Sequence, residues 1–487
     1  MRLLDLSFHV LRMETRFPFR YGIAAMTAAP HVFLRGEFEI AGKRAIGFSS
    51  EGLPPKWFTK SPGTPFSEDL PQMLDVIAGA VERAGASGEG ASLFDWWRAL
   101  YAAQDTGTAR HGVPPLLAHL GTSLVERAGI DAFCRAAGVP FAEAIRQNLF
   151  GVRLGEIHSE LGGFAPGDLI QQGRVADPTL FARHTIGLAD PLADAEIADG
   201  DRVEDGLPQS LEACIGEYGL RYFKIKLCGD FDRDAGRLRD LAGILGTIGP
   251  DCRFTLDGNE QYRTLADFRD HWERHREDSA VREFLSGPRL VFVEQPVHRD
   301  EALAPHVGAD LAAWSDAPPL IIDESDGSLD AARRALELGY AGTSHKNCKG
   351  VLKGLANACL MNKRSADTGR PLILSGEDLA NVGPVALLQD LAAMHAFGVG
   401  HVERNGHHYF RGLGMFGPAM NHRVLDRHGD LYHRQAGGFA TVTIREGKID
   451  LGSVIAAPFG TAFRVDELLE PWLPLAEWRA RGAFDGF

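Results

Sequence analysis

The sequence predicts an α/β protein, in which a modified (β/α) barrel carries an α+β capping domain. After about residue 150, short apolar runs alternate with helical segments, which indicates parallel strands joined by helices. Polar residues end these runs at positions 226, 257, 294, 323 and 346, so that neighbours are roughly one βα unit apart. An open doubly wound sheet would carry a Gly-rich phosphate loop after its first strand, and the sequence has none.

Residues 1–150 are expected to form the capping domain. Apolar residues alternate over 3–11 and 32–40, which predicts an antiparallel hairpin. Residues 17–26 mix aromatic and small side chains without a period. They therefore form either a loop that folds over a ligand or an ordinary hairpin connection.

A helical pattern follows over residues 71–145, with a flexible break at 84–90. Its last long helix is predicted to stop at Gly138 and Pro140, because glycine and proline end helices. The barrel then occupies residues 151–415, with helices expected after its strands over 238–248, 329–338, 352–360 and 385–394.

The C-terminal segment, residues 416–487, is expected to return to the cap. Its clearest element is a hairpin over residues 439–451 that turns at Glu446 and Gly447.

Composition narrows the class of protein. A chain of 487 residues with 45% hydrophobic and 24% charged residues is expected to be a soluble globular protein of two or three units. Its formal net charge of -14 opposes binding to nucleic acid or to anionic membranes. No signal peptide or spanning segment is evident, so a cytoplasmic location is expected. The six cysteines show no C-x-x-C pair and no zinc-type spacing, which predicts reduced structural thiols.

Three acidic residues stand where buried apolar runs stop: Asp257, Glu294 and Asp323. Carboxylates at neighbouring strand ends suit a hard cation such as Mg²⁺, or Mn²⁺, and leave positions free for oxygens of a substrate. The alternative is that each is a separate strand-end cap or ion-pair partner. Glu324 competes with Asp323, because strand alternation turns only one of the two into the barrel mouth.

Two lysines bracket these acids in the sequence. Lys226 ends the run Tyr222-Phe-Lys224-Ile-Lys226, and Lys346 ends Gly342-Thr-Ser-His-Lys346. We predict that both point inward as candidate proton carriers. Lys224 either lowers the pKa of Lys226 through like charge or binds a carboxylate, whereas an exposed edge strand is the plain alternative.

In their order and spacing, these motifs resemble the mandelate racemase and muconate lactonizing enzyme family of the enolase superfamily. The resemblance covers nearly the whole chain, and no single motif carries it. The motifs are the helix from Ala128-Gly-Ile-Asp131 to Pro140, Lys-x-Lys at 224–226, Leu-Asp-Gly-Asn at 256–259, Val-Glu-Gln-Pro at 293–296, Asp-Glu-Ser at 323–325 and Lys346-Asn-Cys-Lys349-Gly350.

The resemblance implies a modified TIM barrel and an Mg²⁺ site made by Asp257, Glu294 and Asp323. It implies that Lys226 and Lys346 flank the α-carbon of a small carboxylate, whose α-proton leaves to give a metal-stabilised enediolate. A lysine on the sixth strand without a histidine on the seventh resembles the muconate lactonizing branch. Racemisation or epimerisation, cycloisomerisation and β-elimination all stay open.

Substrate contacts are predicted from a wider set of residues. We expect residues 17–26, together with Glu403-Arg404-Asn405 of the eighth strand, to determine which substrate binds. A homo-oligomer is expected. The predicted substrate-binding residues are Asn259, Glu324, Glu377, Phe19 and Tyr21.

Two features depart from the family pattern. His345 stands directly before Lys346, so a shift of one position would present His345 instead, and residues 271–287 form an extra charged segment. An acid-sugar dehydratase of the same superfamily, using Lys226 with His345 or His401, is therefore one alternative. The second alternative is a barrel that binds metal and ligand without catalysing a reaction.

Overall fold

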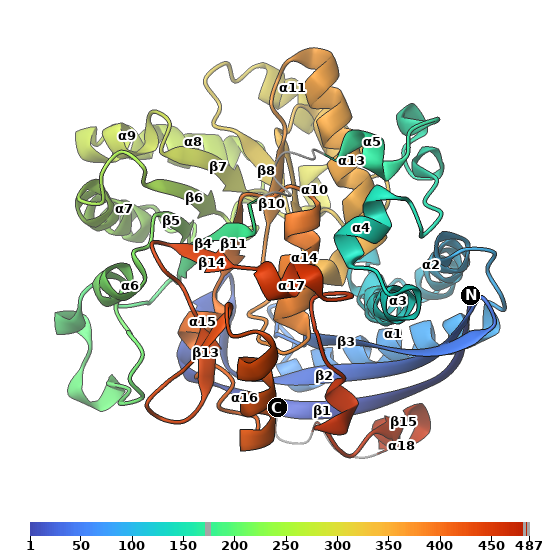
Figure 1. The fold of residues 1–487 in the computed structure, drawn as a ribbon. Helices are drawn as coiled ribbons and strands as arrows, with labels where there is room; N and C mark the ends of the chain where they lie inside the picture. The colour runs from blue at the N-terminus through green and yellow to red at the C-terminus, as the bar shows by residue number, and fades with distance from the viewer. Residues whose placement is uncertain (171–176, 481–483, 485–487) are drawn as a thin grey trace.

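The computed structural model describes residues 1–170, 177–480 and 484, which form a capping domain and a barrel (Figure 1). An antiparallel sheet with strand order β15-β1-β2-β3 is one layer of the cap, and helices form the other. The N-terminal elements are β1 (Arg2–Tyr21), β2 (Ala24–Ile40), β3 (Lys43–Gly52), α1 (Phe66–Ala86), α2 (Leu93–Ala109), α3 (Pro115–Ala137) and α4 (Phe141–Arg146).

The predicted N-terminal hairpin is confirmed and is longer than expected. β1 and β2 pair from Arg2 opposite Glu39 to Tyr21 opposite Ala24, so residues 17–26 continue the hairpin rather than form a loop. The register shifts between Glu14 and Phe19. This irregularity interrupts the alternation of side chains, which explains why the sequence shows no strand period there.

Helix α3 packs against the cap sheet. It ends as predicted at Gly138, whose φ of 66° is left-handed. A Cβ on Gly47 of β3 would lie 2.0 Å from the carbonyl oxygen of Ala128, so sheet and helix pack backbone to backbone. The buried guanidinium of Arg127 donates to Glu51 at 2.8 Å across this interface.

Eight parallel strands close into a barrel, because the last of them, β11, pairs with the first, β4. This closure confirms the predicted barrel and excludes the open sheet. The barrel strands are β4 (Thr179–Ile186), β5 (Tyr222–Lys226), β6 (Arg253–Asp257), β7 (Leu290–Glu294), β8 (Leu320–Ile322), β9 (Gly342–His345), β10 (Ile373–Gly376) and β11 (His401–Arg404).

Helices follow the barrel strands where the sequence predicted them. The extra charged segment, residues 271–287, completes one helix and forms another, and its Phe284 stacks on Phe254 of β6 with ring centroids 4.1 Å apart. The helices are α6 (Leu211–Tyr218), α7 (Phe231–Gly246), α8 (Leu265–His275), α9 (Ser279–Leu285), α10 (Arg299–Ala302), α11 (Pro305–Ala312), α12 (Ala331–Leu338), α13 (Val351–Thr368) and α14 (Ala386–Ala396). No helix in the described part of the chain is long and apolar enough to cross a bilayer.

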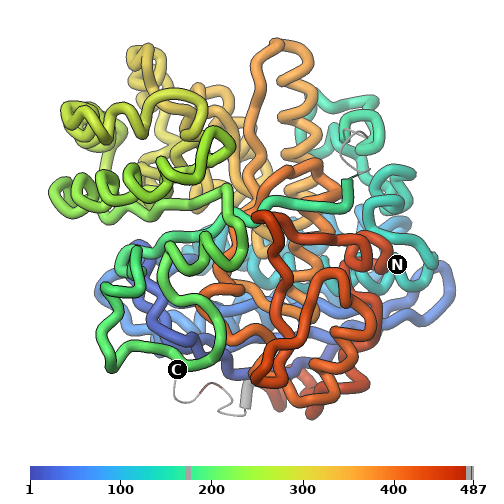
Figure 2. The backbone as a smooth tube through the Cα atoms, turned by 60° about the vertical axis from the view of Figure 1, so that its left-hand side comes forward, coloured from blue at the N-terminus to red at the C-terminus, as the bar shows by residue number. Residues whose placement is uncertain are grey.

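The predicted hairpin over residues 439–451 is only partly formed. The turn at Glu446 and Gly447 is present, with φ of 51° and 73°, but its two arms pair with different strands. β13 pairs with β12, whereas β14 extends the barrel sheet beside β4. The later β15 and α18 return to the cap beside β1, and Asp466 pairs with Arg35 of β2, so the red tail runs beside the blue strands in Figure 2. The tail elements are α15 (Gly406–Tyr409), α16 (Pro418–Arg427), β12 (Tyr432–Arg434), β13 (Ala440–Val442), β14 (Lys448–Asp450), α17 (Gly452–Ala456), β15 (Leu473–Pro474) and α18 (Leu475–Ala480).

Asp390 of α14 should make folding stability depend on pH. Burial, followed by the charges of Glu51 and Asp378, raises the pKa of Asp390 from 3.8 to about 8. The folded state therefore holds a proton that the unfolded state releases, and stability is lost as the pH rises from about 4 to 8. This group contributes a slope of about 1.4 kcal/mol per pH unit in that window.

Asp390→Asn is expected to flatten this slope and to exceed the wild type in unfolding free energy at pH 8. Urea denaturation at several pH values measures the unfolding free energy and its dependence on pH. Asp367→Asn, at an exposed position of α13, is the control. An unchanged slope in Asp390→Asn would show that Asp390 is ionised in the folded protein.

Candidate active site

The predicted functional residues meet at the carboxyl-terminal mouth of the barrel. Lys226 is opposite Asp257, and Asp257 is opposite Glu294, in consecutive strand pairs. Asp323 and Lys346 follow directly after β8 and β9. The mouth holds a cavity between barrel and cap. Its lining is Phe19, Tyr21, Met26, Pro54, Trp57, Lys224, Lys226, Asp257, Asn259, Asp323, Lys346, Asp378, Leu379, Ala380, Glu403 and Asn405.

Lys224 lies at the centre of a group of carboxylates. Its side chain is 1% exposed, and burial alone would lower its pKa, but the surrounding acids outweigh burial and raise the pKa well above its usual value. Lys224 is therefore a fixed ammonium that offsets part of the negative charge of the four acids around it. Its Nζ lies 2.9 Å from Asp257 Oδ2, 2.8 Å from Glu294 Oε2, 2.6 Å from Glu377 Oε2 and 3.1 Å from Glu403 Oε2.

Lys226 and Lys346 stand on opposite walls of the cavity. Their strands, β5 and β9, are separated by three strands in either direction around the closed eight-stranded barrel. Lys226 donates to Asp257 Oδ2 at 2.6 Å, and Lys346 donates to Asp323 Oδ2 at 2.5 Å. Each lysine is thus held by an acid on the strand end beside it.

Lys346, and not His345, faces the cavity. The His345 ring points outward, because a Cβ on Gly354 of α13 would lie 2.2 Å from its Nδ1, and it packs edge-on against Phe397. The Nζ of Lys346 lies 4.8 Å from the centre of the Trp57 ring. Burial acts to lower the pKa of Lys346, but the charges of Asp323 and Glu294 outweigh it and raise that pKa.

Asp323 and Glu324 separate as strand alternation requires. Asp323 lines the cavity, and its carboxylate also accepts from Ser344 and Lys349. Glu324 turns away, accepts from Asn259 Nδ2 at 3.3 Å, and is not among the cavity-lining residues. Burial and then the charge of Asp323 raise the pKa of Glu324 to about 7.

The predicted substrate contacts divide into two groups. Phe19, Tyr21 and Asn259 line the cavity, whereas Glu324 and Glu377 do not. The carboxylate of Glu377 accepts from Arg183, Ser375 and Lys224, and its contact with a substrate stays a prediction.

The acidic residues match a hard cation in donor type. Glu294 is fully buried, and its Oε1 has no hydrogen-bond partner among the described residues and lies 4.0 Å from the Nζ of Lys346. Burial and the charges of Asp257 and Glu377 raise the pKa of Glu294 well above the usual value. A bound cation would offset this cost of holding a buried negative charge. Each of the three acids pairs with an ammonium group: the Nζ of Lys224 lies 2.9 Å from Asp257 and 2.8 Å from Glu294, and the Nζ of Lys346 lies 2.5 Å from Asp323.

Sequence reasoning missed several residues of this site. Arg183 of β4 is fully buried and reaches past the neighbouring β11 to Glu377, which follows β10. An arginine inside the apolar run Leu180-Phe-Ala-Arg-His was the available signal. Trp57 enters from the segment after β3, which carries no pattern linking it to Lys346.

No protein-family model and no curated protein matches the chain. Solved structures match it over nearly its whole length. A dipeptide epimerase from Enterococcus faecalis, complexed with Mg and the dipeptide L-Leu-L-Tyr, is 15% identical with a TM-score of 0.57, covering 94% of this chain and 99% of that one. An N-succinyl Arg/Lys racemase from Bacillus cereus is 14% identical with a TM-score of 0.56, covering 97% and 99%. A muconate lactonizing enzyme from Pseudomonas fluorescens, complexed with muconolactone, is 17% identical with a TM-score of 0.54, covering 96% and 98%.

The chain has the fold of the enolase superfamily. The closed parallel barrel and the antiparallel capping sheet are the features that it shares with the mandelate racemase and muconate lactonizing type of that fold. At such identities the likeness concerns the fold, so the activity has to be argued from the residues that this chain places in the enolase-superfamily barrel.

Proposed function

We propose that the protein is a metal-dependent enzyme that removes the α-proton of a small carboxylate and returns a proton to the resulting enediolate. The observation that carries this proposal is the pair of buried lysines on opposite walls of one cavity, Lys226 and Lys346. Two proton carriers facing each other across a bound carbon are what racemisation and epimerisation require. We place the protein with the lysine–lysine isomerases of the superfamily.

The two lysines would act in opposite protonation states. One takes the α-proton at its Nζ as a neutral amine, and the other, as an ammonium, delivers a proton to the opposite face. Asp257 and Asp323 hold the two Nζ atoms in place by the hydrogen bonds at 2.6 and 2.5 Å. Lys224 stays cationic beneath them and stabilises the negative charge that develops on the substrate.

Mg²⁺ or Mn²⁺, when held by Asp257, Glu294 and Asp323, supplies further positive charge beside the carboxylate of the substrate. The other side of the cavity is apolar, formed by Phe19, Tyr21, Met26, Trp57 and Leu379, and it excludes water from the reacting carbon. Glu403 and Asn405, at the end of the eighth barrel strand, remain our candidates for residues that select the substrate.

The histidines required by the dehydratase alternative lie away from this cavity. His345 packs against α13, and His401 is the first residue of β11, at the barrel end opposite the mouth. No observation therefore favours that reaction. A barrel that only binds ligand would have little use for so many buried charges, each of which is costly to desolvate.

Exchange of α-protons with solvent tests the proposal. The purified protein is incubated in D₂O with N-acyl amino acids, dipeptides, hydroxy acids and unsaturated diacids, and deuterium is followed by NMR and mass spectrometry. We expect exchange in at least one class when Mg²⁺ is present, loss of exchange after chelation, and recovery when Mg²⁺ is returned. Ligand binding that depends on metal but gives no exchange and no product in any class would contradict an isomerase.

A further inference from the structure

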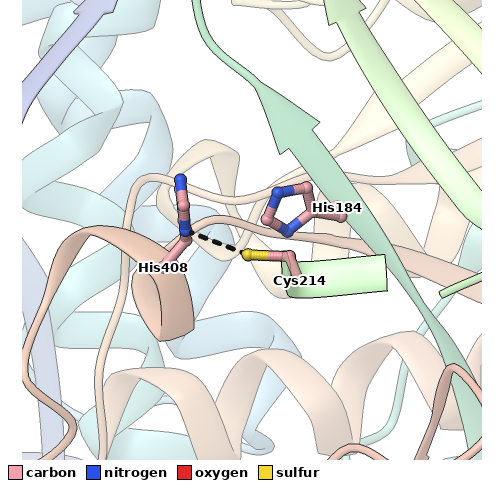
Figure 3. Close-up of side chains that lie close together, drawn as sticks. All are labelled: His184, Cys214 and His408. Carbon is pink, nitrogen blue, oxygen red and sulfur yellow. Dashed lines mark hydrogen bonds between the residues drawn. The ribbon is translucent and has the colours of Figure 1, made fainter. Parts of the chain in front are cut away.

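We propose a second metal site, distinct from the barrel mouth, made by His184, Cys214 and His408 and suited to Zn²⁺ (Figure 3). All three side chains are buried, and one ligand atom of each lies within 4.8 Å of the others. They come from β4, α6 and α15. The sequence shows no zinc-type spacing because the fold, not a local motif, brings these residues together.

The distance between Cys214 and His408 suits tetrahedral coordination. The Sγ of Cys214 lies 3.6 Å from His408 Nδ1, the contact drawn as a dashed line in Figure 3. Zinc binds sulfur at about 2.3 Å and imidazole nitrogen at about 2.0 Å, which places the two donor atoms about 3.5 Å apart in a tetrahedron. An ion between these two atoms would draw in His184, whose ligand atom lies within 4.8 Å of both.

The surroundings provide the outer partners that metal-binding imidazoles usually have. The Nε2 of His408 lies 3.8 Å from a carboxylate oxygen of Asp190, which is itself fixed by Tyr409 at 2.5 Å. The Nδ1 of His184 lies 3.1 Å from His407 Nε2. The contact with His407 orients the His184 ring before any ion binds, and Asp190 places a carboxylate near the outer nitrogen of His408.

Metal binding requires neutral imidazoles and a thiolate, so the Cys214 thiol would lose its proton to solvent as the ion binds.

Two nitrogens and one sulfur select a borderline-soft ion over Mg²⁺. The protein supplies three ligands. The fourth position would be filled by water, or by a neighbouring side chain after a small movement. His184 lies on β4 and His408 follows β11, and these are the two strands that close the barrel. A bound ion would therefore join both sides of the seam to α6 and stabilise the fold.

Cobalt provides the test, because a thiolate bound to Co²⁺ gives a near-ultraviolet charge-transfer band and tetrahedral Co²⁺ gives strong visible bands. Chelator-treated full-length protein is titrated with Co²⁺ in excess Mg²⁺, which keeps the all-oxygen barrel mouth from contributing. We expect both sets of bands to saturate at one equivalent and to disappear when Zn²⁺ is added.

Cys214→Ser should lose the charge-transfer band, and Cys359→Ser, a buried cysteine of α13 outside the cluster, should retain it. Zn²⁺ should raise the melting temperature of the wild type and of Cys359→Ser more than that of Cys214→Ser. Absence of the band from the wild-type titration would overturn the site whether or not the variants fold. A band that survives in Cys214→Ser would overturn it too, leaving a hydrogen-bonded thiol and imidazole.

Discussion

Lys226→Ala and Lys346→Ala are each expected to lower the rate of α-proton exchange from one stereoisomer by about 10³-fold or more, because general bases contribute about 10² to 10⁴ in rate. Each variant removes the proton carrier from one wall of the cavity. Interconversion of the two stereoisomers should stop in both variants. Residual exchange should involve one stereoisomer in Lys226→Ala and the other in Lys346→Ala, since each variant keeps one base.

Deuterium incorporation into separated stereoisomers measures this directly. Lys363→Ala removes an exposed ammonium paired with Asp367 on α13 and should leave exchange unchanged. Circular dichroism and urea denaturation check that the variants fold. Full activity in either lysine variant would show that this lysine does not transfer the proton. If both variants lost exchange from the same stereoisomer, the two lysines would not act on opposite faces.

Lys224→Met is expected to have the largest effect on stability, a loss of about 3–5 kcal/mol in unfolding free energy, as when one partner of a buried charge pair is removed. Methionine fills much of the same space, but it leaves four buried carboxylates without the ammonium that lies 2.6 to 3.1 Å from them. The loss should be smaller in saturating Mg²⁺, which supplies another cation, and smaller at acidic pH, where carboxylates take up protons.

Urea denaturation gives the unfolding free energy. Adding Glu294→Gln to Lys224→Met removes one negative charge with the positive one, and the double variant should recover part of the loss. Lys363→Met, which breaks an exposed pair, should cost less than about 1 kcal/mol. A Lys224→Met protein as stable as the wild type would show that the carboxylates are already protonated in the folded state.

Much of the barrel and its mouth could be predicted from the sequence. Parallel strands place their carboxyl ends at one edge, so Lys226, Asp257, Glu294, Asp323 and Lys346 had to converge once the strands were recognised. Strand alternation also limited the choice between neighbours, and geometry then turned Lys346 inward and His345 outward.

What the sequence could not predict depends on contacts between distant segments. The ammonium of Lys224 meets Glu377 and Glu403, which are about 150 and 180 residues later, and no local pattern encodes that meeting. The arms of the tail turn pair with separate strands for the same reason, because strand partners are chosen by tertiary packing. The cluster of His184 with Cys214 and His408 is likewise a product of barrel closure.

A crystal structure with Mg²⁺ and a carboxylate ligand tests the central claim most directly. The account predicts the α-carbon between the two lysines, with the Nζ of Lys226 near one face and the Nζ of Lys346 near the other, each at roughly 3–3.5 Å as in a near-attack geometry. It also predicts oxygens of Asp257, Glu294 and Asp323 on the metal. A ligand held on one side of both lysines, or a metal bound away from these three acids, would contradict it.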